Sequence, residues 1–144
     1  MLSFEQFTAF AQQGYNRIPL ALELLADLDT PLSVYCKLAN RPYSYLFESV
    51  HGGERWGRYS IIGLSSQQRL EVRDHTVRIY HEDTLLSEQQ SSDPLAFIED
   101  YQAQFRVPEV EGLPRFTGGL VGYFTYDSVR FFEKKLSKTH KPDP

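Results

Sequence analysis

Residues 69–81 read RLEVRDHTVRIYH, and this stretch decides the fold class. On both sides of Asp74-His75, apolar residues stand at every second position and alternate with charged or polar ones. That period is typical of two antiparallel strands that expose one face to water. Asp74-His75 is the expected tight turn between the two strands.

Two earlier segments extend this pattern toward the start of the chain. Tyr43–Val50 (YSYLFESV) and Tyr59–Leu64 (YSIIGL) are short and rich in aromatic and β-branched residues, as strands usually are. We therefore predict an antiparallel meander over residues 43–81. Farther along, Ser87–Ser92 (SEQQSS) is predicted as a polar loop and Gly118–Phe124 (GGLVGYF) as a buried strand.

Helix-start signals mark three further elements, because a capping side chain or a proline at the first helical position favours a helix. The predicted starts are Ser3-x-x-Gln6, Thr30-Pro31 and Asp93-Pro94. Gly14 is expected to end the first helix, and the second should end near residues 40–42. A short helical turn is expected over residues 127–132.

One segment, Arg17–Leu25 (RIPLALELL), fits neither period cleanly. Pro19 excludes a helix interior there but permits an edge strand. The predicted fold class is α+β, with an antiparallel sheet that forms half of a sandwich and helices packed on one side.

The composition excludes several classes of protein. The chain has 144 residues, a net charge of −4 and one cysteine, Cys36. A single cysteine rules out an internal disulfide framework, and Cys36 is expected to be a small buried residue. The negative charge argues against nucleic-acid binding, and no apolar run approaches the roughly 20 residues that span a bilayer. We expect a soluble, cytoplasmic protein that binds neither nucleic acid nor membrane.

A search for catalytic and metal-binding motifs is mostly negative. The four histidines have no metal-ligand spacing. The glycine clusters at 52–57 and 118–122 match neither a P-loop nor the dinucleotide-binding fingerprint. Tight turns and close backbone approach within a sheet explain both clusters more simply.

One constellation suggests a ligand site. Glu48-Ser49 ends one predicted strand and Arg58-Tyr59 begins the next, so the strand–loop–strand connection brings them together. A zwitterionic amino acid needs such a set: an acceptor for its ammonium group, a charged donor for its carboxylate, and apolar walls. Phe47, Trp56 and Tyr59 are the candidate walls. A surface ion pair that pins the hairpin explains the same residues equally well.

At these residues the sequence resembles the amino-terminal region of anthranilate synthase component I. Four blocks carry the resemblance in the family's order: residues 27–33 (DLDTPLS), 45–50 (YLFESV), 52–63 (GGERWGRYSIIG) and 118–130 (GGLVGYFTYDSVR). The match covers nearly the whole chain, from about Arg17 to Pro144, and the four ordered blocks make the resemblance specific.

The resemblance implies a function for the full-length protein. Members of the family are lyases of tryptophan biosynthesis that convert chorismate to anthranilate and pyruvate, using ammonia that a glutamine amidotransferase subunit releases. They need Mg²⁺, and their chorismate and metal residues lie in the carboxy-terminal half. The resemblance therefore implies that residues 1–144 are the regulatory domain, inactive alone, within a cytoplasmic hetero-oligomer.

The resemblance also implies a site for the feedback inhibitor L-tryptophan. The family's Leu-Leu-Glu-Ser element maps onto residues 46–49, with Phe47 in place of a leucine. That replacement changes a wall of the pocket but keeps its polar end. The next strand contributes Gly57, Arg58 and Tyr59. The expected inhibitor-binding residues are Ser49, Glu48, Arg58, Tyr59, Gly57 and Leu46, with no catalytic or metal-binding residue in this chain.

Two alternatives stay open. Aminodeoxychorismate synthase component I has a similar amino-terminal domain and a different product, although the block at 54–63 (ERWGRYSIIG) favours anthranilate synthase. A free-standing amino-acid-binding module is the alternative from a different class of protein.

Overall fold

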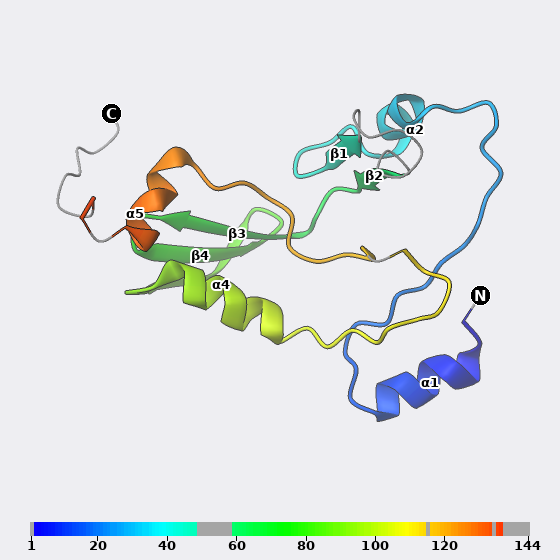
Figure 1. Cartoon of the computed structure of the whole chain (residues 1–144), viewed down its shortest axis with the longest axis horizontal. Helices are drawn as coiled ribbons and strands as arrows, with labels where there is room; N and C mark the ends of the chain where they lie inside the picture. Colours follow the sequence, from blue (N-terminus) through cyan, green and yellow to red (C-terminus); the bar gives the residue numbers. More distant parts are fainter. Residues whose placement is uncertain (1, 49–58, 115, 134, 137–144) are drawn as a thin grey trace. The chain divides into compact units, whose positions relative to one another are not determined.

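The computed structural model describes residues 2–48, 59–114, 116–133 and 135–136, and the fold is α+β, as predicted. Two small antiparallel sheets, with strand orders β1-β2 and β3-β4-β5, accompany the helices (Figure 1). In chain order the elements are α1 (Phe4–Gln12), α2 (Pro31–Leu38), β1 (Tyr45–Glu48), β2 (Ser60–Gly63), β3 (Gln68–Arg73), β4 (Thr76–His81), β5 (Thr84–Gln90), α4 (Pro94–Ala103), the 3₁₀ helix η1 (Tyr126–Ser128) and α5 (Val129–Phe132).

The chain divides into two compact units. The first contains residues 1–23, 74–76 and 90–144, and the second contains residues 24–73 and 77–89. The first unit therefore holds α1, α4, η1 and α5, whereas the second holds α2, the β1-β2 hairpin and most of the three-stranded sheet.

The helix starts are where the sequence predicts them. Ser3 and Gln6 form the predicted capping box of α1, in which each side chain accepts a hydrogen bond from the other residue's backbone N–H (3.2 and 2.9 Å). Thr30 caps α2, and Ser33 completes a second capping box that the sequence analysis did not identify. Such caps depend on neighbouring residues alone, so the sequence determines them.

In the first unit, α4 begins at Pro94 with Asp93 as its cap. The Asp93 carboxylate accepts hydrogen bonds from the N–H groups of Leu95 and Ala96, both at 3.1 Å. Beyond the helix, Asn16 holds the chain that follows α1 against residues 104–106: its amide donates to Gln104 O and accepts from the Arg106 N–H. The expected helical turn over residues 127–132 is also present, as η1 and α5.

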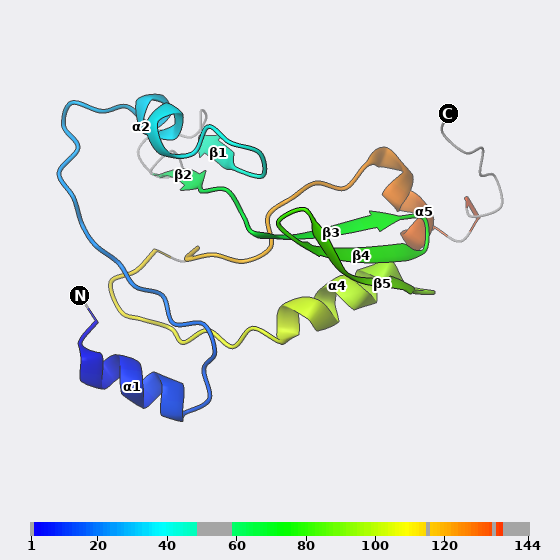
Figure 2. The same ribbon diagram turned by 180° about the vertical axis from the view of Figure 1, so that it is seen from behind.

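The polar loop predicted at Ser87–Ser92 is wrong, because β5 continues through Gln90 as an edge strand beside β4 (Figures 1 and 2). Polar side chains stabilise this edge across the strand pair. Arg78 donates to the Glu88 carboxylate at 2.5 Å, and Gln90 donates to Thr76 Oγ1 at 2.8 Å. An edge strand needs only backbone pairing and one covered face, so its sequence lacks apolar alternation.

The buried strand predicted at Gly118–Phe124 is also wrong. These residues have no regular secondary structure, and the side chains of Leu120, Tyr123 and Phe124 are exposed. Gly118 and Gly119 have φ angles of 138° and 145°, which interrupt a strand. An apolar run of this kind forms a strand only when a neighbouring strand satisfies its backbone, and none of the described strands pairs with it.

Few residues are deeply buried. Among the described hydrophobic residues, only Ala39 and Val77 are fully buried. Cys36 is exposed, contrary to expectation, and none of the residues of α2 is buried. Among the described residues, no helix has both the length and the apolar character that crossing a membrane requires.

Candidate functional site

The candidate ligand site lies at the end of the β1-β2 hairpin where the chain passes from β1 to β2. The strands are antiparallel, with Tyr45 opposite Gly63 and Glu48 opposite Ser60. The chain leaves β1 and enters β2 at the same end, so the two predicted strand ends are adjacent. The expectation that Glu48 lies beside the start of the next strand is confirmed.

The two faces of this hairpin differ in character. Because opposed residues in an antiparallel pair share a face, Leu46 and Glu48 face one side with Ile62 and Ser60. Tyr45 and Phe47 face the other side, and their rings are 4.9 Å apart. A ligand bound to one face of the hairpin therefore contacts either Glu48 or Phe47. Only a ligand at the end where the chain connects β1 to β2 can contact both.

The Tyr45 ring leaves no room for a side chain at position 63, which explains the glycine there. A Cβ atom added to Gly63 would lie 2.0 Å from Cε1 of Tyr45, whose ring covers the glycine. Aromatic rings that cover a glycine across a strand pair stabilise a position that otherwise weakens a strand. This packing fixes the direction of Tyr45 at the end of the hairpin opposite the connection between the strands.

Short polar contacts fix the chain just before β1. Ser44 donates to Arg41 O at 2.7 Å and lies 3.1 Å from the Tyr35 hydroxyl of α2. Ser65 donates to Pro42 O at 2.7 Å, and the Ser66 N–H donates to Tyr43 O. These contacts join the segment that precedes β1 to α2 and to the segment that follows β2.

Arg69 on β3 supports the segment that leads into the β1-β2 hairpin, a role that was not predicted from the sequence. Its guanidinium lies over the Tyr43 ring, 4.7 Å from the centroid, and over the Tyr80 ring at 4.1 Å. It also donates to the Glu71 carboxylate at 2.7 Å and to Glu82 O at 3.0 Å. The bond to Glu71 raises the pKa of Arg69 above its usual value. Arg69 therefore joins the three-stranded sheet to the segment that enters β1.

No sequence signal identified this role for Arg69. In the alternating pattern, Arg69 occupies a position that is normally solvated, and Tyr43 precedes the strand by two residues. Tyr43 has a φ angle of 60°, which is uncommon for a bulky residue. Arg69 contacts Tyr43 and Tyr80, which lie 26 and 11 positions away in the chain, and the tertiary fold sets such contacts.

The predicted site residues are only partly described. Leu46 is half-buried, whereas Glu48 and Tyr59 are exposed. The Glu48 carboxylate makes no hydrogen bond or ion pair with any described residue. Ser49, Gly57, Arg58 and the candidate wall Trp56 lie outside the described residues.

The described part of the chain shows no group of three or more acidic, histidine or cysteine side chains that could hold a metal ion. Among the described residues, the charged acceptor at this end of the hairpin is the Glu48 carboxylate, and its aromatic neighbours in the chain are Phe47 and Tyr59. That chemistry suits an ammonium group attached to an apolar or aromatic body.

Comparison with known proteins then identifies relatives over the whole chain. The chain is 58% identical over 140 residues to anthranilate synthase component 1 of Pseudomonas aeruginosa, which covers 97% of the chain. It is 54% identical to the Neisseria meningitidis serogroup B protein of the same name and 43% identical to that of Aquifex aeolicus. This chain is a homologue of part of anthranilate synthase component 1.

The match covers only a fraction of each relative. The chain spans 28% of the Pseudomonas aeruginosa anthranilate synthase component 1 and 30% of the Neisseria meningitidis one. These shares are consistent with the amino-terminal portion that the sequence motifs indicate. No family model matches the chain, and no solved structure matches it significantly.

Proposed function

We propose that this chain is the tryptophan-binding regulatory part of an anthranilate synthase component 1. The full protein would convert chorismate and ammonia to anthranilate and pyruvate in the cytoplasm, with Mg²⁺ bound outside this chain. A glutamine amidotransferase subunit would supply the ammonia. The observation that supports the regulatory role is the hairpin register, which brings the exposed Glu48 side chain to the end where residues 49–59 connect the strands.

Each proposed binding residue has a distinct task. Glu48 would accept the ammonium group of L-tryptophan, and Arg58 would donate to its carboxylate. Ser49 and the backbone at Gly57 would complete the polar end. Leu46 and Tyr59 would contact the indole ring. Such a division suits a zwitterion with a large apolar side chain.

Inhibition would act through differential affinity. An inhibitor shifts a conformational equilibrium only by as much as it prefers one state, and a 100-fold preference corresponds to about 2.7 kcal/mol. A hydrogen bond to a charged group contributes roughly 1.5–3 kcal/mol, so the Arg58 contact could supply that preference alone. Tryptophan would thus favour the conformation in which the chorismate site stays open.

The test is a steady-state assay of the full-length protein that contains this chain, with chorismate, Mg²⁺ and ammonia. Anthranilate fluorescence is followed with and without L-tryptophan. Anthranilate formation that tryptophan suppresses supports the proposal. Consumption of chorismate without anthranilate supports aminodeoxychorismate synthase instead, and no turnover supports an amino-acid-binding module.

Two substitutions in that protein test the site. Glu48→Gln and Ser49→Leu should each raise the tryptophan concentration for half-inhibition about tenfold or more, because each removes a contact to a charged group. Inhibition is measured relative to each variant's own uninhibited rate. Glu99→Gln makes the same chemical change at an exposed position of α4 and should leave inhibition unchanged. Unaltered sensitivity in Ser49→Leu would show that the site is wrongly assigned.

A further inference from the structure

The segment between α1 and α2 exposes a row of leucines. Leu20, Leu22 and Leu24 are 71%, 67% and 75% exposed. They alternate with Ala21 and Glu23, so in an extended chain the three leucines share one face. An alternation of large apolar residues with smaller or charged ones is typical of a strand that covers a core.

The backbone around these leucines also has no hydrogen-bond partner within the part of the chain that the structure describes. It has no regular secondary structure, and from Ile18 to Leu25 it makes no hydrogen bond with any other described residue. An extended segment with unpaired N–H and C=O groups and an apolar face is a template on which a neighbouring strand can pair. Pro19 has no N–H, so it suits an edge position.

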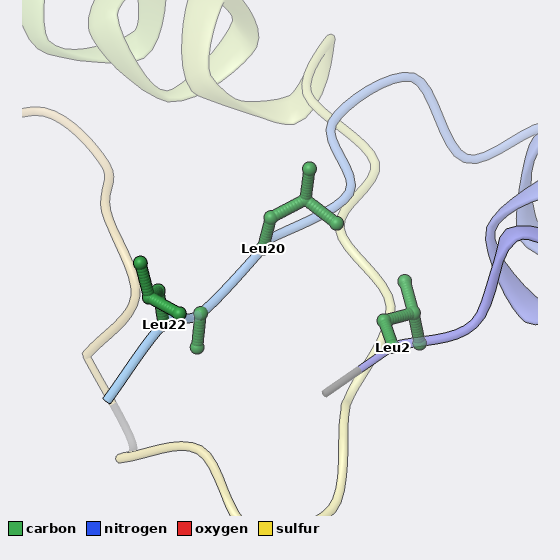
Figure 3. A pocket seen from close by; sticks show the side chains of 4 residues that line it. Leu2, Leu20 and Leu22 are labelled. Carbon is green, nitrogen blue, oxygen red and sulfur yellow. The ribbon is translucent and has the colours of Figure 1, made fainter. Parts of the chain in front are cut away.

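An apolar hollow lies against two of these leucines, Leu20 and Leu22. Leu20, Ala21 and Leu22 border it together with Leu2, which precedes α1, and its volume is about 380 Å³. The leucine side chains come from two separate stretches of the first unit (Figure 3). The hollow therefore offers a place for apolar side chains next to an unpaired backbone.

We propose that residues 20–24 form a strand that pairs with the edge of a sheet supplied by the part of the synthase polypeptide outside the matched region. The Leu20–Leu22–Leu24 face would be buried against that part. Its existence is seen in the relatives, because this chain spans only 28% of the Pseudomonas aeruginosa protein. The inference rests on this homology and is independent of tryptophan binding.

A second copy of the chain is the less favourable occupant. Two separate chains lose translational and rotational freedom when they associate, and a short strand with three leucines is a small surface to offset that loss. A covalently continuous polypeptide does not pay this cost. Glu23, between the leucines, would stay on the solvent side of the new strand.

The test uses a chimera in which this chain continues into the remaining part of the Pseudomonas aeruginosa relative. Hydrogen exchange is measured for the amides of residues 20–25 in the chimera and in the 144-residue chain. A strand at a sheet edge pairs alternate N–H groups, so alternate amides should exchange about 100-fold more slowly in the chimera. Equal exchange rates in the two proteins would overturn the proposal.

Two lysine substitutions in the chimera identify the buried face. Leu22→Lys should reduce the protection of these amides about tenfold or more, whereas Glu23→Lys, on the opposite face, should change it less than about threefold. Leu22→Ala is the milder variant if Leu22→Lys does not fold, and it should reduce protection in the same direction. Equal effects of Leu22→Lys and Glu23→Lys would contradict the assigned face.

The mass of the 144-residue chain in solution distinguishes the alternative occupant. The proposal expects a monomer whose residues 20–25 exchange rapidly. A dimer that protects these amides and dissociates on Leu22→Lys would assign the face to a second copy and overturn the proposal. Neither measurement depends on chorismate or tryptophan, so a failure here differs from a failure of the proposed function.

Discussion

At the scale of single residues, the hairpin depends on side chains that act across strands. The guanidinium of Arg69 lies over two tyrosine rings and donates hydrogen bonds to a carboxylate and a carbonyl. A planar guanidinium can stack on rings with its faces while its N–H groups donate at its edges. A lysine could supply the charge but not both ring contacts. The position is therefore specific for arginine, although the sequence pattern marks only a polar residue there.

Gly63 gives the sharpest prediction at this scale. Gly63→Ala should destabilise the hairpin by about 1–3 kcal/mol, because the new methyl group would overlap the Tyr45 ring. Thermal unfolding followed by circular dichroism measures the change. Gly122→Ala is the matched control, since a Cβ there meets nothing within 4 Å, and it should be nearly neutral. A stable Gly63→Ala variant would show that the ring moves aside without cost.

A pH dependence is predicted at the start of α2. Hydrogen bonds from Lys37 and Ser33 lower the pKa of Asp29 below its ordinary value of 3.8. A carboxyl whose pKa is depressed by folding stabilises the folded state above its unfolded pKa, and this contribution is lost as the pH falls through the folded value. The stabilisation should therefore be fully present at pH 6, begin to fall near the ordinary pKa and disappear once the pH is below the lowered pKa of the folded state.

Thermal unfolding of the wild-type chain and of Asp29→Asn between pH 6 and pH 2 checks this expectation. The wild type should have the higher Tm at pH 6, and the two values should converge at the acid end. Asp100→Asn provides the control for removing an exposed carboxylate from a helix and should show no such convergence. A constant difference between wild type and Asp29→Asn across the range would rule out the titration of Asp29 as its cause.

At the scale of elements, local capping chemistry determines where the helices begin. Asp93 illustrates this, because its carboxylate accepts from two N–H groups of the first turn of α4. Asp93→Ala should destabilise α4 by about 1 kcal/mol, whereas Asp93→Asn, which keeps an acceptor, should cost less. Hydrogen exchange of the α4 amides measures both effects. Equal losses in the two variants would indicate that charge, and not capping, stabilises the helix start.

The strands are less local than the helices. β3 and β4 alternate in the sequence and were predicted within one residue, but β5 was not, since its residues 87–90 are all polar. β5 exists because β4 offers a free edge and because Arg78 and Thr76 pair with its side chains. Residues 118–124 show the opposite case. Their composition favours a strand, but no described strand pairs with them.

At the scale of the whole molecule, the chain has two compact units and very little deeply buried apolar surface in its described part. Hydrophobic burial is the main term that offsets the loss of chain entropy, so the chain on its own should be marginally stable. The proposed pairing of residues 20–24 with the rest of the synthase would add such burial. The chimera should therefore unfold at a higher temperature and more cooperatively than the 144-residue chain.

The sequence by itself determined the α+β class, the starts of α1, α2 and α4, the hairpin turn at Asp74-His75 and the family to which the chain is homologous. These features depend on residues close together in the chain or on the order of motifs along it, and the sequence alone contains both kinds of information. It also indicated that Glu48 lies beside the start of β2, because a short connection joins the two strands.

Only the tertiary structure decided which face each residue occupies, where β5 ends and what supports the hairpin. The contacts of Arg69 with Tyr43 and Tyr80, and the covering of Gly63 by Tyr45, join positions that lie 11 to 26 residues apart. The physical reason is that strand pairing and side-chain packing depend on which surfaces meet. Residues 20–24 and 118–124 have strand-like sequences, but a strand forms only when a neighbour pairs with its backbone.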